Sequence, residues 1–441
     1  QPSIISAQVL TMCRRLMECL PFVRDGDARN GCRLASGSAV VRARRPRSSL
    51  ESGILLIAAD DCRLQFSGRV VIGESCARFD WPATRFVFST TASRVAVRMD
   101  AGRNYFNVVV NGRRVAVLKG SQGVMDYWID ACPVGAPRAV VEFQKRTEAR
   151  ISTPLQAFFG GVTKPVMLHG VLVENGDLVD TPAAPMRSIE FIGDSETAGF
   201  GNCGPSEPGT PGWKACFTMN PADQDAFQAW PACVAEKLQA DLSIIAWSGM
   251  GVLWNAPMGG CTTRHTMIDV YGHVVACEAD APGDRRESPG VSTLDAWIPD
   301  IIVLYIGGND WYSFSEAREG ELSAACRELL LRIRSLRPQA TILVLCASGE
   351  SFCACMGSRE EQMRFAADME RCWRRAVAEA SDARIHLETV LPSPIIDVTD
   401  PSDWGQMAHW SAQGHAKWAR AAIPLVAKHA GWPVPMPASC L

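Results

Sequence analysis

The sequence carries little net charge and has no apolar run long enough to cross a membrane. Lys and Arg together number 44 and Asp and Glu 47, which gives a formal net charge of -3. No overall basic field is therefore available to attract nucleic acid or anionic membranes. The longest apolar run, residues 53–59, is far shorter than the roughly 20 residues that a membrane-spanning helix needs. These absences exclude a transmembrane segment and argue against nucleic-acid partners.

Closely paired cysteines are also missing, although the sequence contains 17 cysteines. No two of them have the Cys-x-x-Cys spacing typical of zinc sites, and a single alanine between Cys353 and Cys355 is a weak metal or redox signal. Because the cysteines are scattered, we predict buried thiols with a few disulfides and no metal site. The odd count leaves at least one cysteine without an intramolecular partner.

The first residues give no clear signal peptide, since Arg14 and Arg15 interrupt the only apolar stretch there. Neither this segment nor the cysteine content settles the compartment, and secretion stays an open alternative. The sequence likewise leaves the oligomeric state open.

Two regions with different patterns begin after a featureless leader. Residues 1–61 show no sustained periodicity, and we predict a poorly ordered leader there. From 62 to 180, short β-branched runs are separated by turn residues, and Asn111-Gly112 between two of these runs is a strong hairpin signal. The runs are residues 85–89, 93–99, 105–110, 113–118 and 138–143. This pattern predicts an antiparallel β-sandwich.

A stretch with two prolines, residues 181–186, separates this region from the next pattern. In residues 186–432, apolar strands alternate with amphipathic helices. The expected strands are 189–192, 242–246, 301–306, 341–345 and 384–387, and the expected helices are 226–240, 322–336, 360–380 and 412–430. This alternation predicts a three-layer α/β domain, in which helices cover both faces of a parallel sheet.

Three glycine-containing motifs each follow one of the expected apolar strands. They are Gly193-Asp194-Ser195, Ser248-Gly249-Met250-Gly251 and Gly307-Gly308-Asn309-Asp310. The carboxyl ends of parallel strands lie at one edge of a sheet, where such folds place their ligand sites. We therefore expect the three motifs to converge on one crevice, although each of them alone could be an ordinary turn.

The residues of these motifs are the ones that acyl transfer requires. A hydroxyl group becomes a nucleophile beside a base, and the oxyanion that forms needs preorganised donors. We predict that Ser195 is the nucleophile, and that its own backbone N–H, the Gly249 N–H and the Asn309 side-chain amide are the donors. Asp194 and Asp310 are predicted to support the site by accepting hydrogen bonds from the loop backbone.

The base is expected to be a histidine. Among the seven histidines, His409 stands just before the last expected helix, on a loop that can reach the edge of the sheet. His415 falls within the start of that helix, and we expect it to be a packing or capping residue. The sequence thus predicts that Ser195 and His409 form the catalytic centre.

These blocks resemble those of the SGNH (GDSL-like) hydrolase superfamily, whose serine, glycine, asparagine and histidine match Ser195, Gly249, Asn309 and His409. More narrowly, the sequence resembles carbohydrate esterase family 2, in which a jelly-roll β-sandwich precedes an SGNH domain. The segments that carry this likeness are 79–82, 104–112, 145–149, 190–202 and 297–303, and the likeness spans about residues 62–430.

The resemblance implies a serine esterase, similar to acetylxylan esterases, that removes O-acetyl groups from polysaccharide or oligosaccharide through a Ser–His acyl-enzyme mechanism. It implies an acetylated carbohydrate as the partner, and neither a metal nor a cofactor. The first domain is expected either to help bind the polysaccharide or only to stabilise the second domain.

The histidine block departs from the family pattern. The family has an aspartate shortly before the histidine, whereas Gln406, Met407 and Ala408 precede His409 here. Asp403, six residues upstream, could fold back as the third member of a triad. Otherwise a backbone carbonyl orients the imidazole, and the site is a Ser–His dyad.

Two other functions fit the same blocks. One is an SGNH lipase or thioesterase, which needs an apolar trench for its acyl chain. The other is a catalytically inactive carbohydrate-binding protein, which the altered histidine block favours. Reaction with a fluorophosphonate probe separates an enzyme from a binder, and a series of p-nitrophenyl esters of increasing chain length separates the two kinds of esterase.

Overall fold

A computed structural model of the chain describes residues 41–46, 52–133, 135–150, 162–205, 220–256, 265–277, 291–347, 358–390, 396–397 and 400–434. Arg14, Arg15, Cys353 and Cys355 lie outside these residues. The cysteines inside them are free thiols, so no disulfide joins any two cysteines of the described part. Among the helices described, none has both the length and the apolar character that a membrane span requires.

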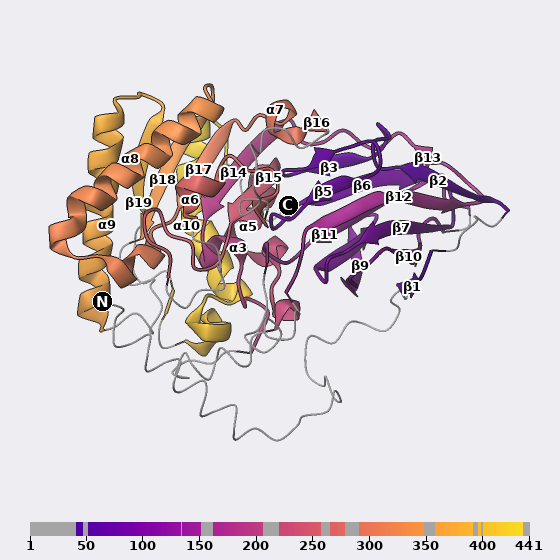
Figure 1. Ribbon diagram of the computed structural model, residues 1–441, viewed down its shortest axis with the longest axis horizontal. Helices are drawn as coiled ribbons and strands as arrows, with labels where there is room; N and C mark the ends of the chain where they lie inside the picture. Colours follow the sequence, from indigo (N-terminus) through magenta and orange to yellow (C-terminus); the bar gives the residue numbers. More distant parts are fainter. Residues whose placement is uncertain are drawn as a thin grey trace, which may run out of the picture. The chain divides into compact units, whose positions relative to one another are not determined.

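Two antiparallel sheets form the first domain (Figure 1). The larger sheet has the strand order β1-β10-β7-β12-β5-β4-β16, with β2 paired to β12. Its strands are β1 (Arg42–Arg44), β2 (Ile54–Ala58), β4 (Val71–Ile72), β5 (Ala77–Phe79), β7 (Arg94–Asp100), β10 (Met125–Asp130), β12 (Val166–Glu174) and β16 (Val291–Ser292). The smaller sheet has the order β13-β6-β11-β8-β9, with β3 paired to β6. Its strands are β3 (Gln65–Ser67), β6 (Arg85–Thr90), β8 (Tyr105–Val110), β9 (Arg113–Lys119), β11 (Ala139–Lys145) and β13 (Leu178–Val179). The predicted antiparallel sandwich is confirmed.

Alternation of side chains along the strands explains how the two sheets pack. In β11, Val141 and Phe143 are fully buried while Glu142 between them is only partly covered. Phe143 stacks on Phe86 of β6, with 5.1 Å between the ring centroids. Asn111 and Gly112 connect β8 to β9 with φ angles of 50° and 75°. Positive φ at both central residues is what a type I′ hairpin turn requires, so the predicted hairpin is confirmed.

Two strands precede residue 62, and the predicted leader therefore extends too far. β1 pairs with β10, and β2 pairs with residues 170–174 of β12. β2 is apolar on both faces, because Ile57 joins the core between the sheets while Leu56 packs against the cluster around Trp128 on the other face. A strand that is apolar on both faces lacks the alternation of apolar and polar residues that predicts a half-buried strand.

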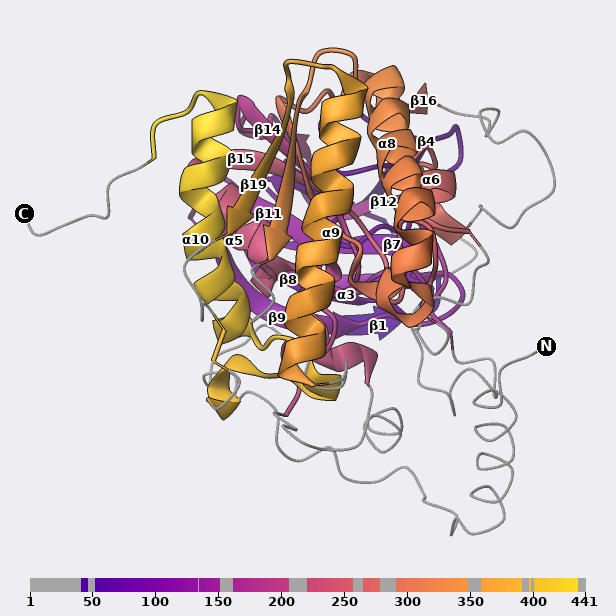
Figure 2. The same ribbon diagram turned by 90° about the vertical axis from the view of Figure 1, so that its left-hand side faces the viewer.

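A five-stranded parallel sheet forms the centre of the second domain, in the order β15-β14-β17-β18-β19. Its strands are β14 (Arg187–Gly193), β15 (Ala240–Ala246), β17 (Ile301–Tyr305), β18 (Thr341–Ala347) and β19 (Ile385–Val390). One face is covered by α5 (Trp230–Leu238) and α10 (Ala412–Ala430), and the other by α8 (Glu319–Leu336) and α9 (Arg359–Ala380), which run side by side (Figure 2). The predicted three-layer α/β architecture is confirmed.

The helix expected from residue 226 begins four residues later. Residues 226–228 form a 3-10 turn, in which the Asp225 carboxylate accepts a hydrogen bond from the Phe227 N–H, and α5 then begins at Trp230 with Pro231 in its first turn. Proline suits this position because the N–H it lacks would have no partner inside the helix.

One strand from the sequence of the second domain belongs to the larger sheet of the first domain. β16 lies between α6 (Met267–Val270) and β17 in the sequence, yet Val291 pairs with Ile72 of β4 in the sandwich. The chain therefore returns to the first domain after β15. The predicted division at residues 181–186 does not fully separate the two domains, because residues 291–292 of the second region belong to a sheet of the first. Residues 38–441 accordingly form one compact unit.

Candidate active site

The three predicted motifs follow three neighbouring strands, because β14 lies between β15 and β17. Ser195 begins α3 (Ser195–Ala198) directly after β14, Gly249 lies in the loop after β15, and Asn309 lies in the 3-10 helix η5 (Gly308–Ser313) after β17. The Asn309 amide donates hydrogen bonds to the Asp194 carboxylate (3.2 Å) and to the Met250 carbonyl (3.0 Å). The structure thus brings the three motifs together at one edge of the sheet.

Ser195 and His409 are in direct contact. The Ser195 Oγ lies 2.9 Å from His409 Nε2, and His409 Nδ1 lies 3.0 Å from the Met407 carbonyl oxygen. A carbonyl oxygen can only accept, so Nδ1 carries the proton and Nε2 is left to accept from the serine hydroxyl. The Phe200 ring packs on the imidazole, with 4.8 Å between the ring centroids. This is the arrangement that a nucleophile and its base require.

An unusual backbone conformation at Met407 aims its carbonyl at the histidine. Met407 has φ 51° and ψ 38°, within the 3-10 helix η8 (Gln406–Ala408). A residue other than glycine adopts this left-handed conformation only where its surroundings enforce it, at a cost of about 1–3 kcal/mol. The neighbouring backbone is fixed on both sides, since the Gly405 N–H donates to the His409 carbonyl (2.7 Å) and the Gln406 N–H to the Gly201 carbonyl (3.1 Å).

Asp403 does not contact His409, which corrects its assignment as a possible third member of a triad. Its carboxylate is fully buried and pairs with the Lys417 ammonium at 2.5 Å. It also accepts from the Asp397 N–H at 2.9 Å. The 3-10 turn η7 (Pro401–Asp403) directs this side chain toward α10, and the Met407 carbonyl occupies the place beside Nδ1.

Two backbone N–H groups of these motifs have no acceptor among the described residues. They belong to Ser195, at the start of α3, and to Gly249, whose φ of 80° is favourable only for glycine. Both residues are buried, so a substrate oxygen placed between them would satisfy two donors that the protein leaves open. The Asn309 amide is the third predicted donor, and both of its hydrogens already point to acceptors in the protein.

The two supporting aspartates each organise one of the loops. Asp310 is fully buried and accepts hydrogen bonds of 2.8 Å from the N–H groups of Val252, Leu253 and Trp254, while burial raises its pKa to about 6. Asp194 accepts from the Glu196 N–H at 3.2 Å as well as from Asn309, and burial raises its pKa to about 7. Asp310 therefore binds loop backbone as predicted, whereas Asp194 also binds a side chain.

Burial keeps the His409 imidazole neutral at neutral pH. Loss of hydration lowers the pKa of its imidazole to about 4, and the hydrogen bond to the Met407 carbonyl opposes this shift only in part. The ring is thus unprotonated and able to accept a proton at neutral pH. A nearby carboxylate would raise this pKa, and none contacts His409 in the described part of the chain.

Glu196 is a site residue that the sequence did not reveal. It follows Ser195 directly, and both of its carboxylate oxygens lie 3.3 Å from the backbone nitrogen of Trp410, the residue after His409. Burial raises the pKa of Glu196 well above its usual range. His415 is fully buried 3.9 Å from this carboxylate, and its Nδ1 accepts from the Trp230 N–H, in keeping with the expected packing role.

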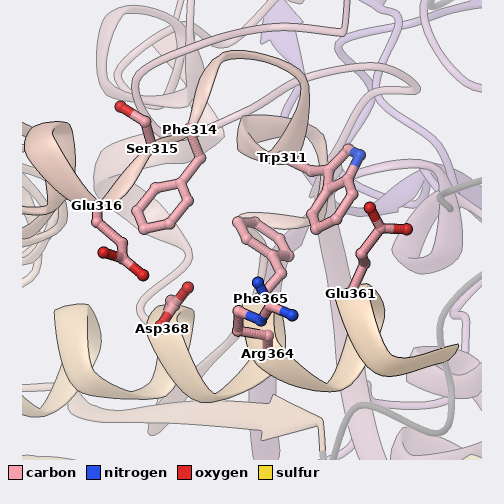
Figure 3. A pocket seen from close by; sticks show the side chains of 8 residues that line it. All are labelled: Trp311, Phe314, Ser315, Glu316, Glu361, Arg364, Phe365 and Asp368. Atoms are coloured by element: carbon pink, nitrogen blue, oxygen red, sulfur yellow. The ribbon is translucent and has the colours of Figure 1, made fainter. Parts of the chain in front are cut away.

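A pocket of about 220 Å³ lies between residues 311–316 and α9 (Figure 3). Its aromatic lining comes from Trp311 and Phe314, on and after η5, and from Phe365 on α9, whose ring makes edge contacts with both. Glu316, Glu361, Arg364, Asp368 and Ser315 complete the lining. Trp311 stands two residues after Asn309, so this aromatic and charged hollow begins on the same short helix as the predicted donor.

Comparison with protein families gives a match for each of the two domains. Residues 191–417 match the GDSL-like Lipase/Acylhydrolase family, and residues 66–165 match the carbohydrate esterase 2 N-terminal family. An acetylxylan esterase / glucomannan deacetylase of Cellvibrio japonicus is 26% identical over 271 residues, which cover 58% of this chain and 64% of that protein. The chain thus spans less than two thirds of the length of this relative.

Solved structures agree with this assignment at the level of the fold. A family two carbohydrate esterase from Cellvibrio japonicus superimposes with a TM-score of 0.66 at 20% identity, covering 86% of this chain and 98% of that one. A family two carbohydrate esterase from Clostridium thermocellum, solved in complex with cellohexaose, gives a TM-score of 0.64 at 20% identity, with 84% of this chain and all of that chain covered. With both domains matched in the same order and the fold shared along their length, the chain belongs to the GDSL-like lipase/acylhydrolases and, among them, to carbohydrate esterase family 2.

Proposed function

We propose that this chain is a carbohydrate esterase that removes O-acetyl groups from polysaccharide or oligosaccharide, with Ser195 as nucleophile and His409 as base. The observation that carries the proposal is the 2.9 Å contact between Ser195 Oγ and His409 Nε2. Two buried N–H groups of the same motifs, of Ser195 and Gly249, lack acceptors in the described protein. These are the nucleophile, the base and the oxyanion donors of acyl transfer.

The proposed reaction has two halves. Ser195 Oγ adds to the acetyl carbonyl carbon while its proton passes to His409 Nε2, and the carbonyl oxygen becomes an anion facing the N–H groups of Ser195 and Gly249. Collapse of this intermediate expels the sugar oxygen, which takes the proton back from His409 and leaves an acetyl-serine. Water then adds in the same way, with His409 again as the base, and acetate leaves.

Met407 takes the part that a carboxylate plays in a triad. Its carbonyl accepts the Nδ1 proton and so holds the ring in the tautomer that presents Nε2 to the serine. The carbonyl stabilises the imidazolium less than a full negative charge would, but its position is fixed by backbone rather than by a rotatable side chain. We therefore propose a Ser–His dyad.

Asn309 is proposed to join the oxyanion site after a local exchange. Its bond to Asp194 is 3.2 Å long, toward the weak end of the usual range, and an anionic substrate oxygen is a stronger acceptor than an aspartate that already accepts from the backbone. The hydrogen that faces Asp194 would be shared with or taken over by an oxyanion placed close to it, while the other hydrogen keeps its bond to the Met250 carbonyl.

A carbohydrate substrate is supported by the relatives and by the pocket. The curated relative from Cellvibrio japonicus is named as a deacetylase of xylan and glucomannan. The pocket that begins on η5 combines the Trp311 and Phe314 rings with carboxylate and guanidinium groups, which suits a ligand with apolar ring faces and hydroxyl edges.

Acetate release from acetylated xylan, glucomannan and monosaccharides tests the proposal directly. We expect turnover on acetylated carbohydrate, and rates on p-nitrophenyl esters that fall from acetyl through butyryl to octanoyl. A preference for octanoyl esters would show a lipase-type acylhydrolase instead. A folded protein that neither hydrolyses any of these esters nor reacts with a fluorophosphonate would be a binder.

A further inference from the structure

A carboxylate of the sandwich domain lies directly against the loop that carries Gly249. Glu148 Oε2 accepts from the Ser248 N–H at 2.5 Å, and Glu148 Oε1 accepts from the Ser248 hydroxyl at 2.6 Å. Both residues are buried, with 1% exposure for Glu148 and 4% for Ser248. The carboxylate therefore uses both of its oxygens on the residue that precedes a proposed oxyanion donor.

Glu148 is itself held in place by contacts to both domains. Its N–H donates to Gln224 Oε1 at 3.1 Å, and Gln224 Nε2 donates in turn to the carbonyl of Ala198, in the short helix that begins at Ser195. The buried Lys145 ammonium donates to the carbonyls of Thr147 (2.5 Å) and Glu148 (3.3 Å) and bends the segment after β11 back on itself. This segment of the sandwich is thus packed inside the molecule, where no polymer can reach it.

The loop after β15 is consequently fixed at two points that lie on either side of Gly249. On the far side, Asp310 of the second domain binds the N–H groups of residues 252–254. On the near side, Glu148 of the first domain binds Ser248. The Gly249 N–H belongs to the peptide group that joins Ser248 to Gly249, so its direction depends on how Ser248 is oriented.

Burying the Glu148 carboxylate costs hydration free energy, which suggests that its two hydrogen bonds to Ser248 have a specific role. Removing a carboxylate from water is unfavourable unless strong hydrogen bonds replace the lost hydration, and burial raises the pKa of Glu148 to about 7. Two short bonds from Ser248 supply that replacement. An apolar residue at this position would avoid the cost but could not orient the Ser248 N–H.

We propose that Glu148 is a positioning residue for the oxyanion site, through which the sandwich domain sets the direction of the Gly249 N–H. This inference rests on the proposed function and deepens it. It gives the first domain a part in the rate of the chemical step, distinct from substrate binding and from general stabilisation.

Three variants of the full chain test this role. Glu148→Ala removes both acceptors, and we expect kcat on p-nitrophenyl acetate to fall about 10–10²-fold with KM within about twofold, since loss of a whole oxyanion donor costs about 10²–10³. Glu148→Gln should keep most of kcat, because its amide oxygen can accept from the Ser248 N–H while its NH₂ donates to the Ser248 hydroxyl. Ser67→Ala is the matched control: it removes a buried 2.6 Å bond between the domains, to Asp241 near the start of β15, and should leave kcat unchanged.

The rate of Ser195 phosphonylation by a fluorophosphonate gives a second reading that needs no carbohydrate. It should slow in Glu148→Ala and stay at the wild-type rate in Glu148→Gln and Ser67→Ala. If wild type fails on acetylated carbohydrate but this pattern holds, the proposed substrate is wrong and the role of Glu148 stands. Unchanged kcat and labelling in folded Glu148→Ala would overturn the inference, as would equal losses in Glu148→Ala and Ser67→Ala. A wild type that does not label would overturn both proposals.

Discussion

Replacing Asp403 by asparagine separates a dyad from a triad. In the structure this carboxylate pairs with Lys417 and with the Asp397 N–H, and the Met407 carbonyl lies beside His409 Nδ1. Loss of a true triad aspartate costs about 10⁴ in kcat, because the imidazole then takes the wrong tautomer. For Asp403→Asn we expect kcat within about threefold of wild type.

The cost of the same substitution should appear in stability. Asparagine can still accept from the Asp397 N–H, but it loses the charge that pairs with Lys417. A hydrogen bond to a charged group contributes about 1.5–3 kcal/mol. Lys417 keeps a quarter of its side chain exposed, so solvent screening brings the expected loss to about 1–2 kcal/mol, or roughly 1–3 °C in Tm.

The measurement is steady-state hydrolysis of p-nitrophenyl acetate by wild type, Asp403→Asn and His409→Ala, with Tm recorded for each. His409→Ala supplies the scale, since loss of the base should lower kcat by several orders of magnitude. A fall in kcat for Asp403→Asn that approaches the His409→Ala value, in protein that is folded, would refute the dyad and show that Asp403 reaches the imidazole during turnover.

Three further outcomes are expected. Ser195→Ala should lower kcat by several orders of magnitude and leave Tm nearly unchanged, and esterase activity close to wild type in the folded variant would disprove the nucleophile. Asn309→Ala should lower kcat roughly 10²–10³-fold, whereas a change confined to KM would make Asn309 a substrate-binding residue. The acidic limb of kcat/KM that belongs to His409 should lie near pH 4: burial lowers the imidazole pKa to about 4, so the neutral base is present above that pH and is lost as the pH falls through it. A limb near the ordinary histidine value of about 6.5 would instead mean that the ring is well hydrated.

The parallel sheet and its three motifs could be predicted from the sequence because strands buried on both faces form continuous apolar runs, as in Ile301–Tyr305. Each motif follows its strand directly, so predicting the three strands also predicted that Ser195, Gly249 and Asn309 lie at the same edge of the sheet. β2 could not be predicted for the opposite reason, since a strand at the edge of an antiparallel sandwich is predicted from alternating apolar and polar residues and β2 has no such alternation.

The support around the site could not be predicted in the same way. Met407 acts through its backbone, and nothing about a methionine signals a carbonyl that turns toward a histidine two residues later. Glu148 and Ser248 lie 100 residues apart and in different domains, so their contact exists only once both have folded. Long-range contacts between polar side chains leave no periodic pattern in the sequence.

The pairing of β16 with β4 has a consequence for how the two domains unfold. β16 follows β15 in the sequence, yet it is the last strand of the larger sandwich sheet. The other strands of that sheet all precede the α/β domain in the sequence. A cut at residues 181–186 would therefore leave the sandwich with a missing edge strand and the α/β part with a strand that has no sheet to join. We therefore expect the two domains to melt together in one cooperative transition, which calorimetry of the full chain can test.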